Sequence, residues 1–172
     1  MRVGKDTLYE YLAHLEDSFL LHTMTVASPS ARVRQVNPRK CYPADPALSA
    51  ALSFRASGDI GHLLETAIYL ELRRRGKSLS YVSTRSGYEV DFLTEDLMGS
   101  RKLVQVCADL EDPATRQREL RALEEGMAET DCKRATLITL REEATVDVAG
   151  NSTRIVPAWR WLLSHERAPE RT

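Results

Sequence analysis

Two strand-like runs between residues 81 and 108 constrain the fold more than any other feature of the chain. The first is EVDF at 89–92, the second is QVC at 105–107, and a short connection at 94–100 contains a glycine. This arrangement predicts an antiparallel hairpin. Because successive side chains of a strand point to opposite faces, we expect Glu89 and Asp91 on one face and Val90 and Phe92 on the other. The hairpin is therefore predicted to have one polar face and one core face.

Composition sets the outer limits. A chain of 172 residues with 42% hydrophobic content suits one well-buried domain with an appendage. Its 24 basic and 25 acidic residues nearly cancel in charge. Any surface that binds nucleic acid would therefore need a local cluster of basic residues. Three cysteines without a C-x-x-C pair disfavour a zinc site and a disulfide framework and indicate a reducing cytoplasm. We see neither a signal peptide nor a membrane-spanning stretch, and expect a cytoplasmic protein with no membrane contact.

The N-terminal part is predicted to be helix followed by hairpin. TLYE at 7–10 has capping-box spacing, and Leu8, Tyr11, Leu12, Leu15 and Phe19 follow at helical spacing, so we expect a helix from Asp6 to about Leu21 with this face buried. The β-biased runs 23–27 and 32–36 flank a Ser-Pro-Ser turn. Helix followed by hairpin is similar to the end of a winged helix. The basic residues of the hairpin and the turn after it, which could contact phosphates or simply be solvated, are Arg32, Arg34, Arg39 and Lys40.

The remaining pattern predicts an α/β fold with a central mixed sheet flanked by helices. Asp45-Pro46 begins a predicted short helix to Phe54, and residues 55–59 resemble a linker, which divides the chain into 1–57 and 58–172. Helices are expected from Ile60 to the glycine at 76 and from 112 to about 129. Strands are expected at 135–140, 146–148 and 154–156, a closing helix at 159–163 and a polar end at 164–172.

The order of three motifs carries a family resemblance. GHLLE at 61–65, GYEVDF at 87–92 and LVQVC at 103–107 resemble the C-terminal domain of unknown function of archaeal-type AAA+ ATPases, a restriction-endonuclease-like domain of the PD-(D/E)XK superfamily. TLYEYL at 7–12 and NPRK at 37–40 resemble the winged-helix segment that precedes it. The resemblance implies a restriction-endonuclease-like sheet after a small winged-helix-like segment. The chain has no G-x-x-x-x-G-K-[ST] motif, so the ATPase module is missing.

The resemblance also implies a site. In active members Glu65 and Asp91 would bind a divalent cation, the Gln105 position would hold a second carboxylate, and the Cys107 position would hold a lysine. A Gln oxygen is a weaker ligand for Mg²⁺ than a carboxylate, and a cysteine cannot supply a lysine's charge. The catalytic set Glu65, Asp91, Gln105 and Cys107 is therefore expected to be degenerate. Glu89 shares the predicted face of Asp91 and completes a weak candidate Mg²⁺ site.

Three functions follow as hypotheses. The first is a non-catalytic module that binds DNA or a partner, such as a separately encoded ATPase. The second is a metal-dependent nuclease with an altered site, and the third is a truncated ATPase relic. Whether the chain is an enzyme stays open at this point. A cysteine nucleophile at Cys107 is disfavoured, because none of the four histidines has a spacing that assigns it to this thiol.

Overall fold

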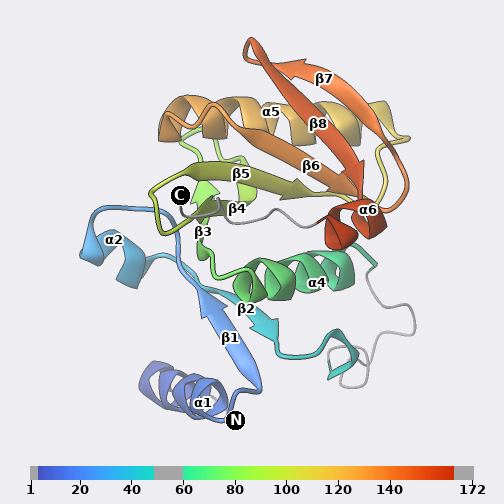
Figure 1. The fold of residues 1–172 in the computed structure, drawn as a ribbon. Helices are drawn as coiled ribbons and strands as arrows, with labels where there is room; N and C mark the ends of the chain where they lie inside the picture. Colours follow the sequence, from blue (N-terminus) through green and yellow to red (C-terminus); the bar gives the residue numbers. More distant parts are fainter. Residues whose placement is uncertain (1–3, 49–59, 165–172) are drawn as a thin grey trace.

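A computed structural model describes residues 4–48 and 60–164 (Figure 1). A six-stranded sheet has the strand order β3-β4-β5-β6-β8-β7, and a separate two-stranded sheet pairs β1 with β2. The elements are α1 (Lys5–Asp17), β1 (Leu21–Met24), α2 (Ala31–Val36), β2 (Lys40–Pro43), α4 (Ile60–Arg74), β3 (Ser78–Ser83), β4 (Glu89–Glu95), β5 (Arg101–Val106), α5 (Pro113–Thr130), β6 (Ala135–Thr139), β7 (Ala144–Val148), β8 (Asn151–Pro157) and α6 (Ala158–Leu163).

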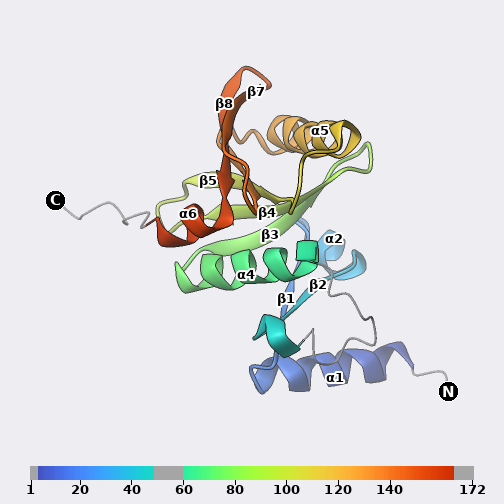
Figure 2. The same cartoon turned by 90° about the vertical axis from the view of Figure 1, so that its right-hand side faces the viewer.

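The large sheet is mixed, as the sequence predicts. The hairpin β4-β5 is antiparallel and so is the pairing of β3 with β4, whereas β5, β6 and β8 run parallel to one another. Helix α5 makes the crossover from β5 to β6 and covers one face of the sheet, while α4 and α6 lie on the other face (Figures 1 and 2). The α/β fold with a mixed sheet flanked by helices is confirmed.

Two buried clusters correspond to these two faces. One joins Ile68 of α4 to Phe92 of β4 and Trp161 of α6, and the other joins Leu123 of α5 to Leu103 of β5. Helix α5 begins at Asp112, whose carboxylate accepts hydrogen bonds from the amides of residues 114 and 115. This is the N-cap role predicted for an Asp-Pro pair.

The predicted hairpin around the Ser-Pro-Ser turn is wrong. Residues 32–36, expected to form a strand, belong to helix α2, whose N-cap Ser30 accepts a hydrogen bond from Val33 N–H at 3.4 Å. The partner of β1 is instead β2, which begins only at Lys40. Strand preference of β-branched residues is a weak prior, and here a serine cap starts a helix turn in its place.

The N-terminal helix also differs from its prediction. Helix α1 begins at Lys5 with Gly4 as N-cap and no side-chain cap, so the capping box at 7–10 does not form. Its predicted buried face is largely exposed, with Phe19 76%, Tyr11 59% and Leu8 53% accessible. Helical periodicity identifies an apolar face but does not say what covers it.

Some predicted features lie outside the described residues. The linker at 55–59, most of the short helix expected up to Phe54, and the end at 165–172 belong to this group. The first turn of that helix is visible, where Asp45 Oδ1 accepts from the amide of residue 47 at 2.8 Å. Within the described ranges, no helix combines the length and apolar character needed to cross a membrane.

Candidate functional site

The geometry of the site begins at Asp91, where β4 departs from regular alternation. Val90 packs in the cluster that contains α5, and Phe92 packs in the cluster that contains α4, so the prediction that they share a face is wrong. The Asp91 amide donates to Gln105 Oε1 at 3.1 Å, and the amide of Val106 donates to Asp91 Oδ2 at 2.9 Å. Side-chain atoms therefore take the place of backbone partners here, and they fix the Asp91 carboxylate at the junction of β4 and β5.

Lys40 of β2 occupies the centre of a carboxylate cluster. Its Nζ lies 3.0 Å from Glu65 Oε1, 2.8 Å from Glu89 Oε1 and 2.9 Å from Asp91 Oδ1. The side chains of Lys40, Glu65 and Asp91 are at most 20% exposed, whereas that of Glu89 is 49% exposed. The structure thus brings the three predicted metal ligands together, around a cation that belongs to the chain itself. We call these four residues the Lys40 cluster.

Burial and charge act in opposite directions on this cluster. Burial raises the pKa of Asp91 to about 6, the neighbouring Glu65 adds to the rise, and Lys40 with the amide of Val106 opposes it. Burial by itself lowers the pKa of Lys40, but the carboxylates outweigh that effect, so its pKa is raised. Lys40 therefore stays charged, and the pKa of Asp91 lies closer to neutral pH than that of an ordinary aspartate.

Tyr42, two residues beyond Lys40, holds Glu65 in place. Its hydroxyl donates to Glu65 Oε1 at 2.7 Å, and burial together with Glu65 raises the pKa of this phenol. Its ring stacks on that of Tyr69, with centroids 4.0 Å apart. Because residues i and i+2 of a strand share a face, β2 presents Lys40 and Tyr42 to the same helix, α4.

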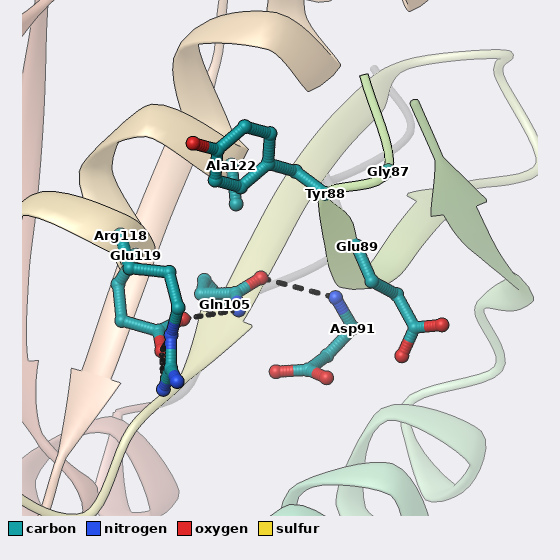
Figure 3. A pocket seen from close by; sticks show the side chains of 8 residues that line it. All are labelled: Gly87, Tyr88, Glu89, Asp91, Gln105, Arg118, Glu119 and Ala122. Carbon is teal, nitrogen blue, oxygen red and sulfur yellow. Dashed lines mark hydrogen bonds and ion pairs between the residues drawn. The ribbon is translucent and has the colours of Figure 1, made fainter. Parts of the chain in front are cut away.

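Gln105 belongs to a different set of contacts. Its Nε2 donates to Glu119 Oε2 of α5 at 2.6 Å, and Arg118 donates to the other oxygen of Glu119 at 2.7 Å. Gln105 therefore commits both ends of its amide, one to the Asp91 backbone and one to α5. In Figure 3 the Gln105 amide lies between Glu119 and the backbone nitrogen of Asp91, and the carboxylate of Glu89 points away from Glu119. The structure does not bring Gln105 into the Lys40 cluster.

A cleft of about 240 Å³ opens between the β4-β5 hairpin and α5 (Figure 3). Glu119 is 6% exposed there, and the sequence reasoning did not find it. The available signal was its spacing, since residues 119, 122, 123, 126 and 127 form the buried stripe of α5. The lining residues are Gly87, Tyr88, Glu89, Asp91, Gln105, Arg118, Glu119 and Ala122.

Cys107 is not among the residues that line this cleft. Its Sγ donates to the backbone oxygen of Asp109 at 3.0 Å, and burial raises the pKa of its thiol. A raised pKa leaves little thiolate at neutral pH, and thiolate is the reactive form. These contacts disfavour a nucleophilic role.

The four residues predicted to contact nucleic acid fall into two groups. Lys40 lies in the carboxylate cluster, where its ammonium pairs with Glu65, Glu89 and Asp91. Arg32 of α2 and Arg39 are exposed, and the Arg39 guanidinium lies 5.7 Å from the ring centroid of Tyr9. Arg34 is less free, since it donates to the backbone oxygen of Ser28.

The carboxylates do not fit the divalent cation that the resemblance implies. Glu65, Glu89 and Asp91 all face the Lys40 ammonium, and Gln105 points to α5. Across residues 4–48 and 60–164, no group of three or more His, Cys, Asp or Glu side chains is arranged to hold a metal ion. An ammonium within 3 Å of each carboxylate supplies the positive charge that a metal would otherwise bring.

Comparison with known proteins adds one relative. The chain is 33% identical, over 175 residues, to the uncharacterized protein MJ1544 of Methanocaldococcus jannaschii. The match covers 95% of this chain and 38% of the relative. No protein-family model matches the chain, and no solved structure matches it.

Proposed function

We propose that the chain is a non-catalytic DNA-binding module built on a degenerate nuclease-like site. The observation that carries the proposal is the Lys40 cluster, because an internal ammonium occupies the centre that a hydrolytic metal would need. Gln105 and Cys107 agree with the proposal that the site is not catalytic, because active nucleases of the resembled family would have a carboxylate and a lysine at these positions. A lysine held among the carboxylates in this way supports the fold rather than hydrolysis of a phosphodiester.

The binding part of the proposal concerns the N-terminal unit. Residues 18–44 contain four basic residues and no Asp or Glu. Lys40 forms ion pairs with the carboxylates of Glu65 and Asp91. The remaining basic residues of this segment are Arg32, Arg34 and Arg39. Arginines on an exposed short helix and in the segment just after it suit phosphate contacts, which give affinity without base specificity.

The test measures binding and cleavage on the same protein. A labelled DNA duplex is titrated with the 172-residue chain over a series of salt concentrations, and the same duplex is incubated with Mg²⁺ and Mn²⁺. We expect binding and no cleavage. Changing Arg32→Gln and Arg39→Gln together should reduce the slope of log K against log salt by about 2, at about 0.9 per phosphate contact.

A matched control keeps the number of lost charges equal. Arg101 and Arg154 are exposed on the large sheet, so Arg101→Gln with Arg154→Gln should leave the slope unchanged. If the wild-type chain binds no duplex, the binding proposal is wrong. Cleavage that disappears in Asp91→Ala would show instead that the site is catalytic.

One observation favours a metal-dependent nuclease as the second candidate. Lys40 Nζ lies 2.9 Å from Asp91 Oδ1, so β2 supplies an ammonium beside the carboxylate although position 107 has none. Lys40→Gln distinguishes the two functions, because a nuclease would lose cleavage, whereas a binding module would keep its affinity for the duplex. Circular dichroism of the variant establishes that it is folded.

A further inference from the structure

Helix α1 exposes a concentration of large apolar side chains. Three of them follow helical spacing along one stripe, Leu8 (53% accessible), Tyr11 (59%) and Leu15 (41%), and Phe19 (76%) lies just beyond the end of the helix at Asp17. Tyr9 and Leu20 add to the patch at 40% and 49%. Contiguous exposed apolar surface of this kind marks an interaction site more often than does a single exposed side chain. We call these six residues the α1 patch.

A second, smaller apolar surface lies on α2. None of the residues of this helix is buried, and Val33 and Val36 are 38% and 70% accessible. Arg32 on the same helix and Arg39 just after it are exposed. We call Val33, Val36, Arg32 and Arg39 the α2 patch. It combines apolar contact with positive charge.

Charge is segregated between the two patches. From residue 7 to residue 31 the chain has three acids, Glu10, Glu16 and Asp17, and no Lys or Arg. From residue 18 to residue 44 it has four bases and no acid. One chain therefore carries an apolar surface with acidic charge and an apolar surface with basic charge. Complementary potentials of this kind favour association and select its orientation.

Other occupants fit the α1 patch less well. An anionic membrane and a nucleic acid would both meet a helix whose charged side chains in residues 7–20 are acids. Direct pairing of α1 with a second α1 would bring acids against acids. The α2 patch supplies apolar side chains together with positive charge.

From this complementarity we infer that the chain forms a two-fold symmetric dimer in which α1 of each copy packs against α2 of the other. A two-fold axis repeats the contact, so the acidic helix meets the basic one twice. The apolar stripe of each α1 then covers Val33 and Val36 of the other copy. The dimer contact and the proposed phosphate contact both use Arg32 and Arg39, so the two contacts exclude each other at these arginines, and the dimer is tested without DNA.

The experiment is a charge-exchange measurement on the 172-residue chain. Sedimentation velocity over a range of concentrations gives the dimer dissociation constant. One variant reverses α1 (Glu10→Arg with Asp17→Arg) and another reverses α2 (Arg32→Glu with Arg39→Glu). Each variant alone carries like charges on both patches and should sediment as a monomer. An equimolar mixture of the two should dimerise again, because each interface then joins opposite charges.

Apolar variants test the packing itself. Tyr11→Gln and Val36→Gln should each weaken the dimer by about tenfold, as expected for central interface residues. Leu97 in the β4-β5 turn is fully exposed, so Leu97→Gln is the matched control and should leave the dimer unchanged. A chain that stays monomeric at all concentrations overturns the inference. So does a dimer that survives both charge reversals, or a mixture that fails to associate.

Discussion

At the scale of single residues, Lys40 decides how the site behaves. Three carboxylates share one ammonium, so the cluster retains excess negative charge when all its members are ionised. Asp91 is only 8% exposed, and burial raises its pKa to about 6. Glu89 remains half exposed, and solvent screens its interaction with Lys40.

The raised pKa of Asp91 makes stability depend on pH. In the folded chain its pKa is about 6, against an ordinary value of 3.8, so the folded state holds the extra proton between these values. Stability from this group is present below about pH 4 and is lost as the pH rises through about 6. Asp91→Asn cannot titrate, so its stability relative to wild type should improve by about 3 kcal/mol between pH 3 and 7.

Urea unfolding at several pH values measures this difference. Glu95→Gln is the control, because it changes an exposed carboxylate on the same strand that is not part of the Lys40 cluster. A wild-type chain that gains stability relative to Asp91→Asn as the pH rises would contradict the prediction.

Removing the ammonium should destabilise the fold. In Lys40→Met the carboxylates of Glu65 and Asp91 lose their counter-ion at sites that are mostly buried. Breaking a fully buried pair costs about 3–5 kcal/mol, and the partial exposure here reduces the expected loss to about 2 kcal/mol near neutral pH. Guanidinium unfolding measures it. Adding Asp91→Asn should recover part of the loss, and additive losses in the double variant would argue against the cluster as a unit.

The candidate site was predictable only in part from single residues. Glu65, Glu89 and Asp91 were correctly singled out as residues that come together, because the motifs fix their strand and helix. For Lys40 the sequence offered only a phosphate contact or solvent, because local charge counting cannot see a partner 51 positions away. Glu119 was not identified from the sequence for a similar reason, since its hydrogen-bond partner Gln105 lies on another element.

At the scale of elements, turn and capping residues in the sequence correctly predicted the hairpins and one helix start. The β4-β5 hairpin, the Asp112 cap of α5 and the β7-β8 pair around Gly150 all agree with the sequence reading. Helix α2 did not, because a serine cap outweighed β-branched residues over so short a run. Regular alternation also failed at Asp91, where side chains replace backbone partners.

The close approach of α5 to β4 gives a prediction at this scale. A Cβ added to Gly126 would lie 2.7 Å from Val90 Cγ2, and Val90 is completely buried. Gly126→Ala gains about 1 kcal/mol of helix propensity, but overpacking costs about 1–3 kcal/mol, so we expect a net loss of about 1 kcal/mol. Thermal unfolding measures it. In a Val90→Ala background the same substitution should stabilise, and an equal loss in both backgrounds would contradict the steric cause.

At the scale of the whole molecule, the N-terminal unit reaches the large sheet through one of the two buried clusters. Met24, Val26 and Tyr42 belong to the cluster on the α4 side. The buried residues of the cluster under α5 include none from the described range 4–48. Ala27, which is partly buried, packs against the edge of this cluster. Further links are the bridge between Val26 and Tyr81 and the hydrogen bond from Tyr81 Oη to the backbone oxygen of Pro38 at 2.7 Å.

This distribution predicts that the N-terminal unit can open while the sheet stays folded. Tyr42 is 1% exposed and stacks on Tyr69, so Tyr42→Ala should cost about 3–5 kcal/mol of docking energy. Native-state hydrogen exchange should then show faster exchange for the amides of β1 and β2, with β6 and α5 close to their wild-type protection. Tyr42→Phe keeps the ring and loses only the hydrogen bond to Glu65, so it should accelerate β1 and β2 much less. If Tyr42→Ala instead accelerates exchange equally in β2 and β6, the chain unfolds as one cooperative unit and the separate opening does not occur.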